Sequence, residues 1–193
     1  VSPAGGNLKE PVTESTKKAA RCFYALEQNR ADQKRYPAVN PIDSYSKYLE
    51  YPEIREHLAE KVRPGWVEMV EKAKNIIRKG KDANDQINIL GDDGVPMSYH
   101  ELFWKSELVD FVILQQDAFD AIDALCPIER QSYMLDLVLG ICDKEFKFED
   151  YEQCRNFFKE LINLLRQMNY SEFKSEKFEN YRQKLTNLLS NGN

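Results

Sequence analysis

The segment RYPAVNPIDSYSKY, residues 35–48, contains the side chains that are best arranged to bind a ligand. Tyr36 is followed directly by Pro37, and Pro41 comes four residues later. Proline fixes its own φ angle, donates no backbone hydrogen bond and restricts the residue before it, so we expect this segment to hold one conformation. A rigid loop that presents an aromatic ring suits two uses, a plug for the protein core or a platform for a planar ligand. These residues alone leave both uses open.

The sequence contains none of the common catalytic or phosphate-binding motifs. It contains no GxxxxGK[ST] phosphate loop and no GxGxxG after a strand. The two histidines, His57 and His100, have no neighbouring nucleophile with which to form a triad. Four cysteines lie far apart without a CxxC pair, which predicts reduced thiols and no zinc site: Cys22, Cys126, Cys142 and Cys154. We therefore predict no catalytic residue and expect the chain to be inactive alone.

Composition limits the class of partner. The chain has 193 residues, a net charge of −5, 42% hydrophobic residues and 31% charged residues. Its Lys and Arg residues are spread among Asp and Glu, which argues against binding nucleic acid or an anionic membrane surface. No apolar run approaches the roughly 20 residues that span a bilayer, and the N-terminus does not resemble a signal peptide. We expect a cytoplasmic location and, because the chain starts at Val1 without methionine, a piece of a longer protein.

Apolar periodicity predicts an all-α fold. Residues 1–11 are expected to form an extended loop, and Gly91–Pro96 a sharp surface turn between two helices. Ser98 and Glu101 match a capping box at the start of the helix after this turn. No alternating strand pattern is longer than four residues. Helices are predicted at residues 13–28, from 43 or 44 to 49, at 52–63, 64–80, 82–90, 98–116, 127–141, 151–168 and 171–189.

Three segments, in the same order and at the same separation, resemble the rotary ATPases. The segment YPAVNPIDSYSKY is similar to the adenine loop Tyr-Pro-Ala-Val-Asp-Pro-Leu-Asp-Ser of F-type catalytic subunits. It is also similar to Phe-Pro-Ala-Ile-Asn followed by Ser-Tyr-Ser in V-type and archaeal-type subunits. VSPAGGNLKEPVT resembles Ser-Pro-Pro-Gly-Gly-Asp…Glu-Pro-Val-Thr of the V-type catalytic A subunit, and ILQQDAFDAIDALCP resembles its Leu-Gln-Gln-Asn-Ala-Phe…Asp…Cys-Pro run.

This resemblance implies the C-terminal helical bundle of a V-type or archaeal-type catalytic A subunit. Residues 1–33 would be the tail of the central nucleotide-binding α/β domain, and residues 34–193 the bundle. ATP or ADP would be the ligand, with the phosphate loop and Mg²⁺ in the domain upstream. The implied partners are non-catalytic B subunits in a hetero-hexameric ring and the central rotor, in a head peripheral to the membrane. The ion moved, H⁺ or Na⁺, and the direction of catalysis stay open.

The resemblance also implies roles for individual residues. Tyr36, stiffened by Pro37, would stack on adenine, and Phe119 would form the second aromatic wall, with Gln115 and Gln116 as polar contacts to the base. The alternatives are a packed turn tyrosine and a core phenylalanine at a helix end. Tyrosine replaces the V-type phenylalanine, and Asp117 replaces the usual asparagine. Lys47, where other subunits have arginine, is interpreted as a surface lysine.

Two segments resemble the parts of F-type subunits that touch the rotating shaft. The first is an acidic tip, Asp92–Pro96, which follows Ile89-Leu90-Gly91. The alternative interpretation of this segment is an ordinary exposed hairpin with no contact to a shaft. Residues 1–7 match the second shaft-contacting segment. Two other interpretations stay open. One is a non-catalytic B-type subunit fragment. The other is a free-standing helical interaction module that binds a partner through Trp66, Trp104 or Phe173.

Overall fold

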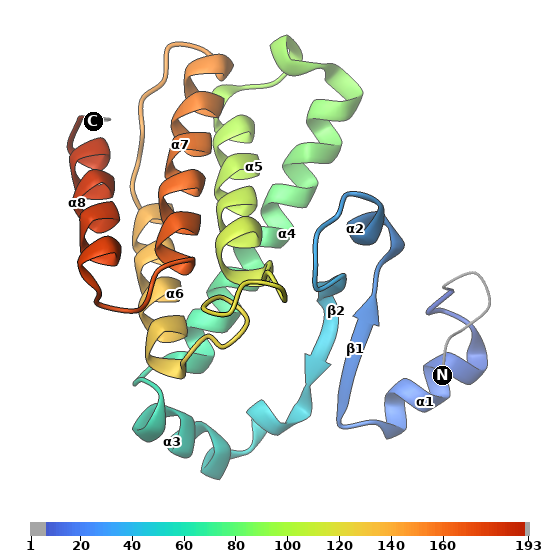
Figure 1. Cartoon of the computed structure of the whole chain (residues 1–193). Helices are drawn as coiled ribbons and strands as arrows, with labels where there is room; N and C mark the ends of the chain where they lie inside the picture. Colours follow the sequence, from blue (N-terminus) through green and yellow to red (C-terminus); the bar gives the residue numbers. More distant parts are fainter. Residues whose placement is uncertain (1–6, 192–193) are drawn as a thin grey trace. The chain divides into compact units, whose positions relative to one another are not determined.

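The computed structural model describes residues 7–191, which are predominantly helical, as predicted (Figure 1). The chain divides into two compact units, Val1–Val67 and Glu68–Asn193. The boundary expected between residues 33 and 34 concerns a longer protein and stays a prediction. Strands on either side of that position pair with each other in the first unit.

The first unit is built around a two-stranded antiparallel sheet. β1 and β2 pair from Cys22 opposite Ser46 to Leu26 opposite Val39, with an irregularity between Phe23 and Ala25. The connection between them contains the short helix α2. The elements are α1 (Pro11–Ala19), β1 (Cys22–Leu26), α2 (Gln28–Asp32), β2 (Val39–Ser46), a 3-10 helix (Lys47–Glu50) and α3 (Pro52–Lys61).

The predicted helices over residues 13–28 and from 43 or 44 to 49 are wrong. The first ends at Ala19, and β1 takes its second half. Of the other, the part up to Ser46 is the end of β2, and only the part from Lys47 onward is helical, as a 3-10 helix. Aromatic residues favour strands where they pack across a sheet, and the ring of Phe23 stacks on that of Tyr45 at 5.9 Å. Strand pairing depends on a partner distant in sequence, which local periodicity does not identify.

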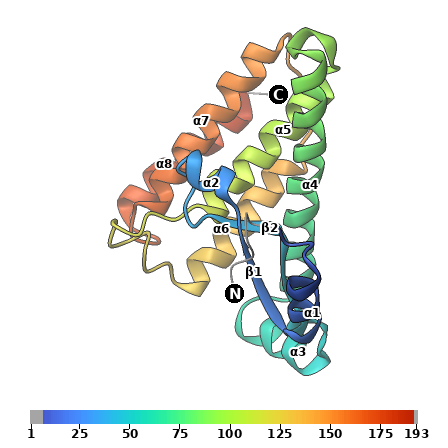
Figure 2. The ribbon, with the colours of Figure 1, turned by 90° about the vertical axis from the view of Figure 1, so that its right-hand side faces the viewer.

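The second unit is a helical bundle. α5 and α7 run side by side, and α8 packs along α7 (Figures 1 and 2). Fully buried apolar side chains on facing helices form its core, among them Leu108, Val138, Phe158, Leu161 and Leu165. The helices are α4 (Trp66–Leu90), a 3-10 turn (Asp92–Gly94), α5 (Met97–Val109), a π-helical segment (Asp110–Leu114), α6 (Ile128–Cys142), α7 (Tyr151–Asn169) and α8 (Glu176–Asn191).

The predicted break at Gly80 is also wrong, because α4 is continuous from Trp66 to Leu90. Gly80 is buried, and a Cβ atom on it would lie 2.0 Å from Ser106 Cβ on α5. This glycine therefore serves a close helix–helix approach instead of a helix end. α5 begins after Pro96 without a side-chain cap, so the predicted capping box at Ser98 does not form. α7 begins at Tyr151 as predicted, where the carboxylate of Asp150 accepts from the backbone N–H of Gln153.

All four cysteines are free thiols, but, unlike the prediction from their spacing, they are not all buried or semi-buried. Burial raises the pKa of both Cys142 and Cys154 to about 12, so these two thiols stay protonated at neutral pH. Cys22 is exposed. We expect iodoacetamide to alkylate Cys22 first in the native chain and to reach Cys142 and Cys154 only after unfolding, as peptide mass spectrometry would report. Rapid native alkylation of Cys154 would contradict this assignment.

None of the helices in residues 7–191 is long and apolar enough to cross a membrane. In the same residues, no group of three or more His, Cys, Asp or Glu side chains is placed to hold a metal ion.

Candidate functional site

Tyr36 lies in the turn between α2 and β2, and its ring is exposed. The side chain is 54% exposed, and its hydroxyl donates to the carbonyl of Ala31 at 3.4 Å. Backbone hydrogen bonds brace the turn, from Arg35 N–H to the carbonyl of Arg30 and from Val39 N–H to that of Pro37, both at 2.8 Å. The Tyr36–Pro37 peptide bond is cis. This exposure argues against use of the ring as a core plug, and its use as a platform for a ligand stays a prediction.

The buried side chain of Asn40, which was not predicted to have a role, organises the residues after Tyr36. Asn40 Oδ1 accepts from the backbone N–H groups of Ile42 and Asp43 at 2.8 and 3.1 Å. Its Nδ2 donates to the carboxylate of Asp43 at 2.9 Å. Asn40 therefore fixes the backbone around Pro41 through its side chain, and the two prolines are not the only restraint on this segment. An asparagine before a proline in a turn-rich stretch is a signal for such a motif.

Phe119 lies on the loop between the π-helical segment and α6, and its side chain is fully exposed (101%). The helix predicted to run to residue 116 ends at Leu114, so Phe119 is well outside it. The backbone N–H of Phe119 donates to the carboxylate of Asp117 at 2.9 Å. The alternative of a core phenylalanine at a helix end is therefore wrong.

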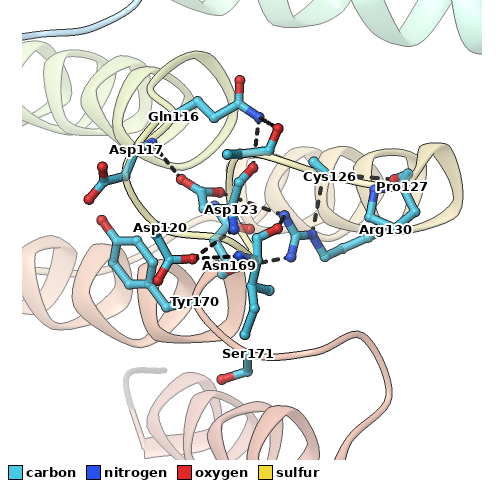
Figure 3. A network of polar contacts seen from close by, with 12 residues as sticks. Gln116, Asp117, Asp120, Asp123, Cys126, Pro127, Arg130, Asn169, Tyr170 and Ser171 are labelled. Atoms are coloured by element: carbon cyan, nitrogen blue, oxygen red, sulfur yellow. Dashed lines mark hydrogen bonds and ion pairs between the residues drawn. The ribbon is translucent and has the colours of Figure 1, made fainter.

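The loop that carries Phe119, residues 115–127, holds its shape through polar groups of its own (Figure 3). The carboxylate of Asp120 accepts from the backbone N–H groups of Ile122 and Asp123 at 3.0 and 2.8 Å. The carboxylate of Asp123 accepts from the N–H of Asp117 at 2.7 Å. Across the loop, Gln116 Nε2 donates to the carbonyl of Asp123 at 2.7 Å. These bonds give an irregular segment a defined conformation.

Arg130 of α6 joins this loop to the end of α7. The side chain is 1% exposed, and its guanidinium donates to the carbonyl of Ile122 at 3.1 Å and to that of Asn169 at 3.0 Å. Its Nε lies 3.2 Å from Cys126 Sγ, and its Nη2 lies 3.7 Å from the carboxylate of Asp123. A buried arginine is stable only where such partners compensate its charge.

Asn169 and Asp123 complete the network around Arg130. Asn169 Nδ2 donates to the carbonyl of Val112 in the π-helical segment at 2.8 Å, so the end of α7 is tied to the end of α5. Burial raises the pKa of Asp123, and the N–H of Asp117 and the charge of Arg130 partly oppose that rise.

Arg130 was not predicted from the sequence as part of the site. The feature that could have identified it is its position four residues before Met134, which places a charged side chain on the apolar stripe of α6.

The predicted site residues fall into two groups. Tyr36 and Pro37 share the turn of the first unit, and Gln116 and Phe119 share the loop of the second unit. Tyr36 and Phe119 belong to different units, so the facing of their rings across one ligand stays a prediction. The amide nitrogen of Gln115 is buried and has no hydrogen-bond partner among the described residues.

The predicted acidic tip joins α4 to α5. Ile89 and Leu90 are 74% and 57% exposed there, and Gly91 adopts a φ of 81°, which favours glycine. His100 is buried, and its Nε2 lies 2.9 Å from the carbonyl of Asp92. The tip and the Phe119 loop lie at opposite ends of α5 (Figure 1). The predicted shaft-contacting segment at residues 1–7 falls almost entirely outside the described residues.

Comparisons with known proteins identify one family, the V- and A-type ATP synthases. Residues 55–157 match the family model described as the C-terminal domain of V and A type ATP synthase. The V-type ATP synthase alpha chain of Chlamydia abortus is 40% identical over 189 residues, covering 98% of this chain and 32% of that protein. The alpha chain of Chlamydia trachomatis serovar D is 41% identical over 179 residues, covering 93% and 30%. The chain thus spans about a third of these relatives.

A solved structure shares the fold. It is the ATP synthase subunit NeqB from Nanoarcheaum equitans, with a TM-score of 0.57 over 74% of this chain and 33% of that one. At 19% sequence identity, this likeness concerns the fold alone.

Proposed function

Since this chain belongs to the family of the C-terminal domain of V- and A-type ATP synthases, we propose that it is that domain of a catalytic A subunit. The name alpha chain of the Chlamydia relatives favours this subunit over a B-type fragment. In the whole subunit, ATP hydrolysis or synthesis would be coupled to H⁺ or Na⁺ transport. The phosphate groups and Mg²⁺ would be bound by the domain upstream.

The proposed role of this domain at the nucleotide is to bind the base. The observation that carries the proposal is the full exposure of Phe119 on a loop whose polar groups bond to one another and to Arg130. An exposed aromatic ring on a well-ordered loop loses little entropy when it stacks on a planar ligand. Tyr36, half-exposed on its braced turn, would supply the second ring.

The proposed mechanical role is to transmit nucleotide binding to a rotor. α5 and the π-helical segment join the Phe119 loop to the acidic tip without a break, over 18 residues and about 27 Å. Two exposed apolar side chains, Ile89 and Leu90 at the end of α4, lie next to Asp92 and Asp93 of the tip in the sequence. Such a mixed surface suits a transient, sliding contact with a partner. The bundle would then move as a rigid lever when the nucleotide site closes.

The proposed assembly follows from this role. The domain would lie in a hetero-hexameric ring with non-catalytic B subunits, around a central stalk, in the cytoplasmic head peripheral to the membrane. A free-standing interaction module would need exposed anchors, but Trp66, Trp104 and Phe173 are all half-buried. Phe173 packs on Tyr133 and Phe178, and the ring of Trp104 contacts that of Phe103. No observation favours that alternative.

The test is the Michaelis constant for ATP of the assembled parent ATPase. Stacking on a base contributes about 1–3 kcal/mol, so Tyr36→Ala and Phe119→Ala are each expected to raise KM about 5- to 150-fold. Tyr36→Phe and Phe119→Tyr keep the rings and should stay near wild type. Tyr24→Ala removes an aromatic residue outside the proposed site whose exposed fraction, 74%, lies between those of Tyr36 and Phe119, and serves as the matched control.

An unchanged KM in both alanine variants would refute the base-binding role. The 193-residue chain by itself should bind ATP too weakly for a micromolar dissociation constant, because the contacts to the phosphates lie elsewhere. Isothermal titration calorimetry measures this directly.

A further inference from the structure

The side chain of His100 binds the backbone of the acidic tip, Asp92–Pro96. His100 lies near the start of α5 and is 4% exposed, and its Nε2 lies 2.9 Å from the carbonyl oxygen of Asp92. A carbonyl oxygen only accepts hydrogen bonds, so Nε2 carries the hydrogen and donates it. The tip is therefore attached to α5 by a buried donor, in addition to the connection along the chain.

The imidazole of His100 is also held by α7. Its ring stacks on that of Tyr151, the first residue of α7, with the centroids 5.7 Å apart and an interplanar angle of 28°. The starts of α5 and α7 lie at the same end of the second unit as the tip (Figure 1). Because the stacking fixes the plane of the imidazole, it also fixes the direction in which Nε2 donates.

The hydrogen bonds of the tip itself are local. The N–H of Gly91 donates to the carbonyl of Ile87 in α4 at 2.8 Å, and the N–H of Gly94 donates to the carbonyl of Gly91 at 3.1 Å. Residues 91–94 are all exposed. A short exposed turn with few buried contacts opens at little cost in free energy. The bond from His100 adds what these local bonds lack, an attachment to a buried side chain.

We infer that His100 is a positioning residue, which holds the tip in one orientation so that a force on the tip passes into α5 and α7. Without this bond, the same force would bend the exposed turn. This inference rests on the proposed function, because it takes the tip as the place where the rotor acts. It concerns how the tip is held by the bundle.

Two substitutions separate the hydrogen bond of His100 from its ring. His100→Phe keeps a ring that can stack on Tyr151 but removes the donor. His100→Gln loses the ring, but its amide nitrogen can reach nearly the same place as the histidine Nε2. If the bond positions the tip, only the phenylalanine variant should be impaired. If His100 merely fills space, the glutamine variant should be the worse of the two.

The first measurement is the exchange rate of the Gly94 amide hydrogen in this chain, followed by NMR. Loss of one hydrogen bond should make opening of the tip, and therefore exchange, about 2- to 12-fold faster in His100→Phe. His100→Gln should stay within about twofold of wild type. His57→Phe replaces the exposed histidine of α3 and is the matched control. Equal exchange in the wild type and both His100 variants would refute the inference without reference to any rotor.

The second measurement compares ion transport with ATP hydrolysis by the assembled parent ATPase in lipid vesicles. A pH-sensitive dye and radioactive sodium report the ion. The fraction of hydrolysis that moves no ion should rise about 2- to 12-fold in His100→Phe, because it follows the population of the released tip. His100→Gln should restore it. A general loss of stability would lower transport and hydrolysis together and leave this fraction unchanged.

Leu90→Asp separates the inference from the function on which it rests. Leu90 is 57% exposed at the end of α4, so an added charge there should disturb a contact with a rotor directly. If Leu90→Asp raises the uncoupled fraction while His100→Phe does not, the inference is wrong and the mechanical role stands. If neither variant changes the fraction although exchange at Gly94 is faster in His100→Phe, the mechanical role fails, and the inference with it.

Discussion

Replacement of Arg130 by methionine is expected to lower the free energy of unfolding of this chain by about 3–5 kcal/mol. Methionine keeps much of the side-chain volume, so the loss is mainly electrostatic. It leaves the carbonyls of Ile122 and Asn169 without this donor and the buried carboxylate of Asp123 without its cation. Groups buried without partners account for most of the cost. Urea unfolding followed by circular dichroism measures it.

Two further variants test whether the charge of Arg130 is the cause. Arg182→Met removes an arginine whose side chain is 52% exposed and paired with Glu179, so its loss should be far smaller. Asp123→Asn added to Arg130→Met removes the orphaned carboxylate and should restore part of the stability. Equal losses for Arg130→Met and Arg182→Met would show that the buried network contributes nothing beyond an ordinary surface pair.

The same variant has a defined pH dependence. Burial raises the pKa of Asp123 in the native chain, so the folded state binds this proton more tightly than the unfolded state. The stability from Asp123 is therefore fully present below the unfolded pKa and is lost as pH rises through the folded pKa. Without Arg130 the folded pKa rises further. The deficit of Arg130→Met relative to wild type should thus narrow on acidification.

Strong periodicity predicted most helices of the second unit, although the predicted break at Gly80 is absent from α4. The heavily apolar face of residues 151–168 corresponds to α7, in which Phe158, Leu161 and Leu165 are fully buried. The strands were not predictable, because β1 reads locally as a continuation of α1. Its conformation is decided by pairing with β2, about twenty residues away, and by the contact between Phe23 and Tyr45. The pattern of apolar residues within β1 does not identify a partner strand that lies this far away in the sequence.

The candidate site also contains residues that could be predicted from the sequence and residues that could not. A resemblance in sequence was enough to single out Tyr36 and Phe119, and their exposure agrees with a platform for a ligand. Arg130 could not be assigned from the sequence, since one of its partners, Asn169, lies 39 residues further along the chain. The bonds of Gln116 Nε2 within the loop were not predictable from the sequence either.

Alanine at Gly80 and alanine at Gly140 are expected to change stability in opposite directions, although both glycines lie within helices. At Gly80 the new Cβ would lie 2.0 Å from Ser106 Cβ and 3.1 Å from the carbonyl oxygen of Leu102, so α4 and α5 must separate. Overpacking of this kind costs about 2–3 kcal/mol. At Gly140 no atom lies within 4 Å of the new Cβ. Only the helix propensity changes there, and alanine should gain about 0.5–1 kcal/mol.

Ser106→Gly combined with Gly80→Ala tests whether the clash is the cause of the loss. The double variant removes the two closest atoms, Ser106 Cβ and Oγ, and should recover much of the stability, as chemical denaturation of the four chains in the cycle would reveal. Recovery should be incomplete, because the carbonyl of Leu102 stays near the new methyl group and glycine at 106 lowers the helix propensity of α5. If Gly80→Ala stabilised the chain as much as Gly140→Ala, the close approach of α4 and α5 at this position would be wrong.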